Sequence, residues 1–188
     1  MCENMIQLYQ KITQLKVLSL FLEDPHTSYY LRESARMLNM DPMTVKRALN
    51  LLVNDDLLIR TEEKNRTLYK ANVENPALRH IKISYNLSEL REKNLVDFIL
   101  NKMKSVSSIM LFGSFAKGAN DKESDVDILI ISLSKDKPTA KLAKHLERDV
   151  NLVNFTPAQW SNQTKDNKAF YLDVITDGIL LYGTKPVV

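Results

Sequence analysis

Residues 107–131 read SSIMLFGSFAKGANDKESDVDILII and place two short apolar runs on either side of a polar turn. The runs, at 109–112 and 128–131, have the length and the bounding turn signals of buried strands. Strand and helix patterns continue to alternate through 86–188, as they do where helices cover a sheet. The sequence therefore predicts an α/β (α+β) fold, with a mixed sheet and helices in this half.

Two carboxylates open the second of these strands. Asp125 and Asp127 are two residues apart, so on a strand both side chains project from the same face. Adjacent carboxylates repel each other unless a cation lies between them, and oxygen ligands of this kind suit Mg²⁺ or Mn²⁺. The pair therefore predicts a metal site whose cation also binds the phosphates of a substrate.

The turn before these carboxylates has the composition of a phosphate-binding loop. Gly113 lets the backbone approach a phosphate closely, and Ser114 adds a hydroxyl and an N–H at a predicted helix start. Lys117 is near enough in sequence to assist with the phosphate charge. An Asp-x-Asp pattern alone is also found at ordinary strand starts. Gly-Ser followed by Ser-Asp-x-Asp between apolar strands is more specific and predicts a nucleoside triphosphate site.

This stretch resembles the minimal nucleotidyltransferases of the polymerase-beta superfamily, and the resemblance covers 86–188 as one domain. Their motif is an apolar strand, Gly-Ser, a later Gly, then Ser-Asp-x-Asp and a second apolar strand. The resemblance implies metal-dependent transfer of a nucleoside monophosphate, often AMP from ATP, to a hydroxyl group on an acceptor. It also implies Asp125 and Asp127 as catalytic metal ligands, with Gly113, Ser114, Lys117, Gly118 and Ser124 around the nucleotide.

The strand expected at 149–155 departs from that family at one position. The family usually has Val-Asp-Leu-Val there, whereas this chain has Asn151 in place of the carboxylate. Asn151 cannot accept a proton at neutral pH. Asp149 lies on the same strand face, ~6–7 Å from the usual position, and is the candidate substitute for catalysis. The sequence thus favours an enzyme, with a nucleotide-sensing regulator that no longer catalyses as the alternative.

Helices are expected at 86–104 and 139–147, and a last strand in the closing sequence DVITDGILLYG. Asn86 and Glu89 have the spacing of a capping box, which would start the first of these helices. We expect a solvated basic face around the second, formed by Lys141, Lys144, His145 and Arg148.

Residues 1–85 carry a mostly helical pattern that ends in a short polar hairpin. A helix is expected at 5–22, with Thr13 as a possible internal break, and another carries the apolar stripe of Leu31, Ala35 and Leu38. Asp41 followed by Pro42 starts a third, because Asp accepts the free N–H groups and Pro fits the first helical position. The expected hairpin has strands at 57–60 and 67–70.

This order of elements resembles the winged helix-turn-helix domain of small prokaryotic transcription regulators, over residues 12–72. The resemblance implies DNA binding, with the third helix in the major groove and the hairpin over adjacent phosphates. It implies base contacts by Thr44, Arg47 and Asn50, and phosphate contacts by Lys46, Lys64 and Arg66. The chain departs from the family at 54–56, where Asn-Asp-Asp stands in place of the usual glycine. Protein docking or dimerisation is the alternative role for this domain.

Composition limits the partners. The charge is 26 − 23 = +3, too small to indicate nucleic-acid binding by itself, and one cysteine excludes a disulfide framework. No apolar run approaches the ~18 residues that span a bilayer, so we expect a cytoplasmic protein without membrane contact. We expect a homodimer through the helix at 5–22, unless its apolar face is core. An antitoxin-like protein that modifies a partner toxin is a further possibility.

Overall fold

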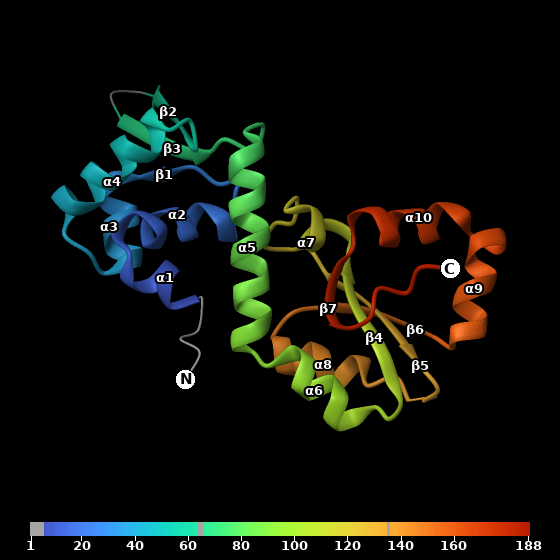
Figure 1. Cartoon of the computed structure of the whole chain (residues 1–188). Coiled ribbons are helices and arrows are strands. Elements are labelled where there is room, and N and C mark those ends of the chain that lie inside the picture. The colour runs from blue at the N-terminus through green and yellow to red at the C-terminus, as the bar shows by residue number, and fades with distance from the viewer. Residues whose placement is uncertain (1–5, 64–65, 135) are drawn as a thin grey trace. The chain divides into compact units, whose positions relative to one another are not determined.

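The computed structural model describes residues 6–63, 66–134 and 136–188 of the chain (Figure 1). The chain divides into two compact units, Met1–Glu89 and Leu90–Val188. The domain boundary expected after residue 85 lies inside a helix, α5 (Pro76–Glu92). Within the described ranges, no helix is long and apolar enough to cross a membrane.

The first unit combines helices with a three-stranded sheet of order β1-β3-β2. Its elements before α5 are α1 (Ile6–Lys11), α2 (Thr13–Glu23), β1 (Tyr29–Tyr30), α3 (Leu31–Leu38), α4 (Pro42–Asn54), β2 (Leu58–Glu63) and β3 (Arg66–Ala71). The start of α4 is capped as expected, because the Asp41 carboxylate accepts the Thr44 N–H at 2.9 Å. The predicted hairpin is present and antiparallel, with Leu58 opposite Ala71.

The helix expected at 5–22 is interrupted next to Thr13, the position that the sequence offered as a possible break. Ile12 adopts an extended conformation, with φ −84° and ψ 116°, and separates α1 from α2. The apolar residues of α2, among them Val17 and Phe21, are fully buried in the core of their own unit. Core packing therefore accounts for the apolar face of α2.

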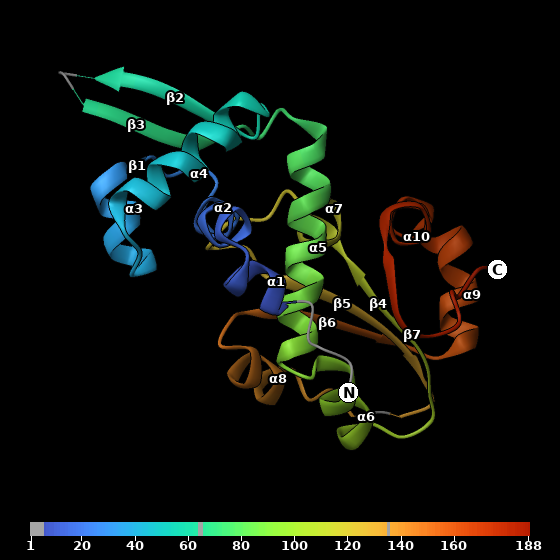
Figure 2. The same cartoon turned by 60° about the vertical axis from the view of Figure 1, so that its left-hand side comes forward.

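The second unit is a four-stranded sheet of order β6-β5-β4-β7 with helices on both faces (Figure 2). Strands β5 and β6 are parallel and the other neighbours are antiparallel. Its strands are β4 (Val106–Phe112), β5 (Val126–Ser132), β6 (Val150–Phe155) and β7 (Ile179–Gly183). Its remaining helices are α6 (Leu95–Lys102), α7 (Gly113–Lys117), α8 (Thr139–Leu146), α9 (Pro157–Asp166) and α10 (Lys168–Asp177).

The continuous apolar runs that predicted β4 and β5 have a simple cause. Both strands are buried on their two faces, so alternation with polar residues is lost. On one face Met110 and Leu129 pack against Trp160 of α9 and Val174 of α10. The predicted mixed α/β fold is confirmed, and Trp160 is a core residue, 1% exposed.

The helix expected at 86–104 is wrong at its start. Asn86 is buried in the middle of α5 and begins no helix. The start is set instead by Asn75 and Pro76, since the Asn75 side chain accepts the Ala77 N–H at 2.8 Å. The helix also breaks at Asn94, whose φ of 49° is left-handed, and α6 follows. The closing sequence is likewise split between the end of α10 and β7.

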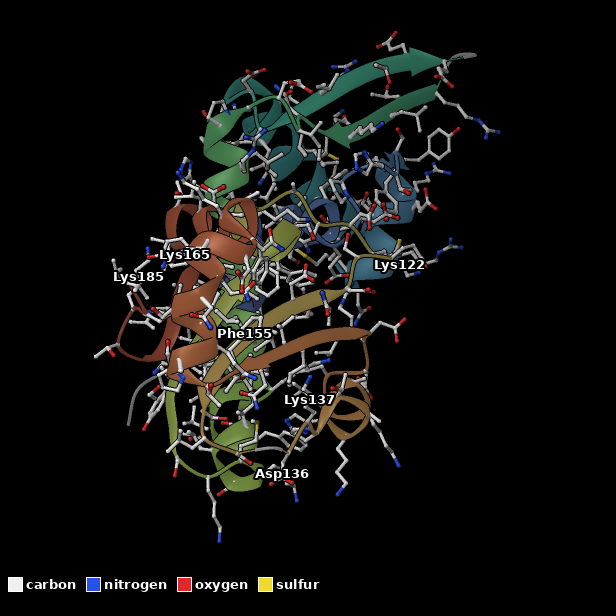
Figure 3. The ribbon with its side chains drawn as sticks, turned by 90° about the vertical axis from the view of Figure 1, so that its right-hand side faces the viewer. Lys122, Asp136, Lys137, Phe155, Lys165 and Lys185 are labelled. Atoms are coloured by element: carbon white, nitrogen blue, oxygen red, sulfur yellow. The ribbon has the colours of Figure 1, made fainter. Side chains whose placement is uncertain are left out.

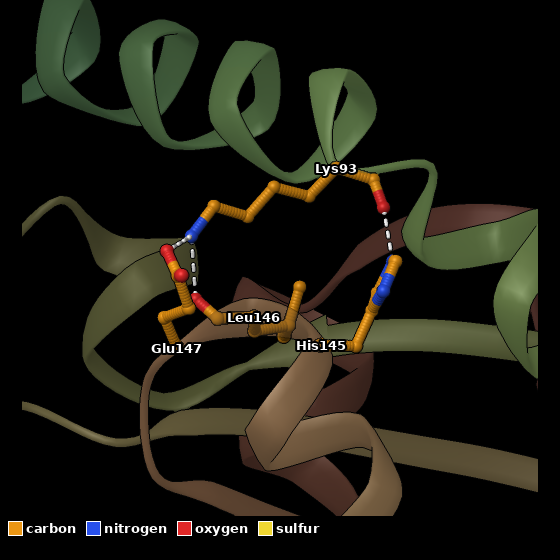
Figure 4. Close-up of polar contacts among 4 residues, drawn as sticks. All are labelled: Lys93, His145, Leu146 and Glu147. Atoms are coloured by element: carbon orange, nitrogen blue, oxygen red, sulfur yellow. Dashed lines mark hydrogen bonds and ion pairs between the residues drawn. The ribbon is translucent and has the colours of Figure 1, made fainter.

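After α5 and at the end of α8, a basic side chain from each segment hydrogen-bonds to a backbone carbonyl of the other (Figure 4). Lys93, after α5, donates to the Leu146 carbonyl of α8 at 2.5 Å and pairs with Glu147 at 3.6 Å. In return, His145 donates from Nε2 to the Lys93 carbonyl, because a carbonyl can only accept. Its ring stacks on Phe98 with centroids 4.3 Å apart. The expected solvated basic face is confirmed for Lys141, Lys144 and His145, which are exposed, whereas Arg148 is half-buried.

Replacing Lys93 with Met should destabilise the second unit, because the last carbonyls of α8 lose their cationic donor. We expect a loss of about 1 kcal/mol, lowering the midpoint of thermal unfolding by about 2–4 °C. Lys144→Met is the matched control, since Lys144 is exposed on the same helix. Equal shifts in the two variants, measured by circular dichroism, would contradict the capping role.

Candidate active site

The sheet topology of the second unit brings the end of β4 and the starts of β5, β6 and β7 to one edge of the sheet. In the antiparallel pair β4–β5, Phe112 at the end of β4 lies opposite Asp127 near the start of β5. In the parallel pair β5–β6, Asp127 lies level with Asn151. The start of β7 pairs with the end of β4, so α10 ends at this edge too. We call it the active edge.

Gly113 and Asp127 meet at the active edge. Gly113 has a φ of +68°, and a Cβ built on it would lie 2.1 Å from Asp127 Oδ2. Any other residue would therefore be strained and would collide with the carboxylate. The sequence reasoning explained this glycine by the approach of a phosphate. The structure adds a second reason, the approach of a carboxylate from the neighbouring strand.

Asn151 makes a direct contact at the position where the family usually has a carboxylate. Its Nδ2 donates to Asp127 Oδ1 at 3.0 Å. The pKa of Asp127 is nevertheless raised above its ordinary value, mainly by burial, with repulsion from Asp125 and Asp173 adding to the effect. The hydrogen bond from Asn151 opposes that rise but does not cancel it. The ionised Asp127 carboxyl is therefore disfavoured at the active edge, mainly because it is partly buried.

Lys117, which the sequence predicted to assist with phosphate charge, is paired with two aspartates of α10. Its ammonium hydrogen-bonds to Asp173 and lies 3.3 Å from Asp177, both on α10. The hydrogen bond to Asp173 is the main reason that the pKa of Lys117 is raised. Sequence reasoning missed the two aspartates. Their signal is the four-residue spacing at the end of a helix, where carboxylates repel each other, oppose the helix dipole and need a cation.

The other predicted nucleotide-site residues build the turn and the loop after it. Gly118 ends α7 in a left-handed conformation, and its N–H donates to the Ser114 carbonyl. The Ser124 hydroxyl donates to the Asp121 carboxylate at 2.8 Å. Asp125 follows in the loop and is exposed. The structure therefore assigns Ser124 a contact inside the loop.

Asp149, the candidate substitute for the third carboxylate, stands just before β6 and is exposed. Its carbonyl accepts the Val126 N–H at 2.9 Å, which places its backbone beside the start of β5. Among the residues that the structure describes, no three His, Cys, Asp or Glu side chains come together as a metal site. A divalent cation still fits the chemistry of the edge, because two adjacent carboxylates and an amide oxygen are ligands that it prefers.

The residues predicted to contact DNA in the first unit differ in their exposure and in their contacts. Lys46, Arg47 and Asn50 are exposed on α4, whereas Thr44 is half-buried and hydrogen-bonds to Asp41. The Arg66 guanidinium lies 5.6 Å from the centroid of the Tyr30 ring. Lys64 lies outside the described residues.

The Asn-Asp-Asp sequence at 54–56, where the resembled family usually has a glycine, ends α4 with a left-handed residue. Asp56 adopts a φ of 57°, the left-handed conformation that glycine supplies more easily. Its carbonyl accepts the side-chain amides of Asn72 and Asn75, at 3.0 and 2.9 Å. These two bonds explain how an aspartate is accommodated at this turn.

Comparisons with known proteins concern mainly the second unit. Residues 93–186, half of the chain, match the family described as polymerase beta, nucleotidyltransferase. Over 105 residues the chain is 26% identical to the protein adenylyltransferase MntA of Shewanella oneidensis, covering 53% of this chain and 70% of that protein.

Two solved structures are also similar. A crystal structure of a toxin–antitoxin with AMP-PNP has 25% identity and a TM-score of 0.40, covering 50% of this chain and 74% of that one. The archaeal chromatin protein TrmBL2 has 10% identity and a TM-score of 0.32, covering 89% of this chain and 73% of that one. Both TM-scores are too low to carry an argument.

Asp127→Asn should stabilise the protein at pH 7 in the absence of divalent cations. The folded-state pKa of Asp127 lies above the ordinary value of 3.8, so ionisation of this carboxyl disfavours the folded state as pH rises through that window. The variant removes the penalty and keeps an oxygen toward Asn151. We expect the midpoint of thermal unfolding to rise by a few degrees at pH 7, and this difference should shrink as the pH falls toward 3.8.

Adding Mg²⁺ should stabilise the native chain more than the variant. Asp166→Asn is the control, because Asp166 is exposed at the end of α9. An unchanged or lower midpoint for Asp127→Asn at pH 7 would contradict the cost of ionising Asp127 in the folded state.

Proposed function

Because the chain belongs to the polymerase beta nucleotidyltransferase family, we propose that it transfers a nucleoside monophosphate from a triphosphate to a hydroxyl group. One observation carries this proposal: the Gly113-Ser114 turn lies against Asp127 at the active edge. A phosphate-binding turn and metal-binding carboxylates must be adjacent for this reaction. The name of the relative, protein adenylyltransferase, favours AMP as the group transferred and a protein as the acceptor.

In the proposed reaction, Asp125 and Asp127 hold a divalent cation, Mg²⁺ or Mn²⁺. When bound, such a cation neutralises phosphate charge and stabilises the leaving pyrophosphate. Gly113 and Ser114 hold the triphosphate, and contacts with Gly113 and Asn151 fix the Asp127 carboxylate in place. Asn151 cannot take the proton of the acceptor hydroxyl. Asp149, exposed before β6, is the residue that we propose for that task.

A nucleotide-sensing protein without turnover is the second candidate. The observation that favours it is Asn151, whose amide donates to Asp127 where a carboxylate would bind metal or a proton. Binding of the triphosphate requires the turn and the two carboxylates but no base. The two candidates therefore differ in transfer and agree on binding.

Incubation with α-³²P-labelled ATP, CTP, GTP and UTP, Mg²⁺ and cell lysate tests the proposal. Label from ATP should appear on a protein, and Asp125→Ala/Asp127→Ala should lower its transfer at least about 100-fold, because the cation loses both carboxylates. Asp166→Asn is again the control. Absence of transfer, with Mg²⁺-dependent ATP binding retained, would favour the sensing protein. Loss of both transfer and binding would contradict both candidates.

For the first unit we propose a winged helix-turn-helix that binds DNA through α4. The supporting observation is that Lys46, Arg47 and Asn50 lie on its exposed face. Among the residues that the structure describes, neither Lys46 nor Arg47 forms an ion pair, so both are available to phosphates or base edges. Met43, 57% exposed on the same helix, favours the alternative of a protein-docking module or homodimer.

For the transfer reaction of the second unit, a toxin is the partner that we propose as the acceptor.

Lys46→Ala/Arg47→Ala should weaken binding to mixed-sequence DNA at least about 10-fold at low salt, and reduce the salt dependence of the affinity. Fluorescence anisotropy measures both quantities. Lys102→Ala/Lys104→Ala removes the same charge from exposed positions in the second unit and serves as the control. Equal losses in the two variants would mean that net charge, and not α4, determines binding.

A further inference from the structure

The two carboxylates of the proposed metal site are held in place by different parts of the chain. Asp127 is inside β5 and is paired on both sides, with Phe112 and Asn151. Asp125 precedes β5 and belongs to the loop that leads into it. The position of Asp125 therefore depends on how this loop is held.

Arg148 contacts that loop three times. Its Nη1 donates to the carbonyls of Asp121 at 3.2 Å, Lys122 at 2.9 Å and Ser124 at 3.1 Å. Lys122 itself is exposed at the outer part of the loop (Figure 3). Hydrogen bonds from a charged donor are stronger than those between neutral groups. A single guanidinium therefore gathers carbonyls from most of the segment before Asp125.

The same guanidinium also contacts the phosphate-binding turn. Its carbon lies 5.2 Å from the centroid of the Phe115 ring, a distance typical of a cation–π contact. Phe115 is buried in α7, directly after Gly113 and Ser114. Arg148 thus joins the loop of one carboxylate to α7, the helix that begins with the Gly113-Ser114 turn.

Backbone carbonyls are the hydrogen-bond acceptors of this arginine in the loop. Inside the loop, Asp121 and Ser124 bond to each other, which closes the segment that the arginine holds. The loop is therefore shaped by local bonds and fixed in place from outside by one side chain.

We propose that Arg148 is a positioning residue for Asp125: by holding the carbonyls of 121–124, it keeps the Asp125 carboxylate beside Asp127 for the divalent cation. This role rests on the proposed function of the active edge. It predicts that loss of Arg148 weakens use of the metal through Asp125 and leaves Asp127, which the sheet holds, in place.

Hydrogen exchange of the unliganded full chain tests the first step. In Arg148→Met, amide exchange across 121–126 should speed up at least about 10-fold, while β4 and β5 stay protected. Arg148→Lys keeps a cation that can donate to the carbonyls and should retain most of the protection. Arg91→Met, an exposed arginine at the end of α5, should change nothing in the loop. Unchanged exchange in Arg148→Met would overturn the proposal, whatever the chain catalyses.

The second step is tested by calorimetry, which measures binding of a non-hydrolysable ATP analogue at a series of Mg²⁺ concentrations. Arg148→Met should raise the half-saturating Mg²⁺ concentration about 10-fold and reach the same maximal binding. In an Asp125→Asn background the same substitution should add no further shift. A shift that persists there in full would overturn the link to Asp125. Absence of nucleotide binding by the native chain would instead overturn the proposed function. The hydrogen-exchange result would then still show whether Arg148 holds the loop at 121–124.

Discussion

The arrangement of the active edge depends on the contact between the Asp127 carboxylate and the backbone of Gly113. The contact requires a glycine, because a Cβ there would overlap Oδ2. It requires the antiparallel register of β4 and β5, which places the end of one strand beside the start of the other. The contact also brings the Asp127 carboxylate into a partly buried place, so one neighbour must donate a hydrogen bond to it. The other neighbour must be small, because the two strands meet closely there. Asn151 and Gly113 meet these two needs.

Local signals in the sequence predicted the parts of this fold that local physics determines. The runs at β4 and β5 are apolar because both faces are covered, and Asp41-Pro42 starts α4 through a bond three residues away. Asn86 was misleading because its spacing to Glu89 imitates a cap. The start of α5 is Asn75-Pro76, which carries the same Asx-Pro signal as the start of α4.

The candidate site was predictable only in its continuous part. Gly113, Ser114, Asp125 and Asp127 lie within one segment, so their spacing indicates a shared chemistry. The aspartates of α10 and the arginine before β6 reach the site through strand order, which a single sequence does not reveal. Lys117 shows the consequence, because its neighbours along the chain suggest a phosphate and its neighbours in space are Asp173 and Asp177.

The amide at position 151 also affects the order in which this unit is assembled. Three carboxylates gathered at one edge would repel one another until a cation arrived, so their folding would be linked to the metal supply. With Asn151 donating to Asp127, the edge is closed by the chain's own hydrogen bond. The unit can therefore complete its sheet during synthesis and acquire a cation afterwards. Metal supply would then change the stability of the folded unit through Asp127, without deciding whether its sheet forms.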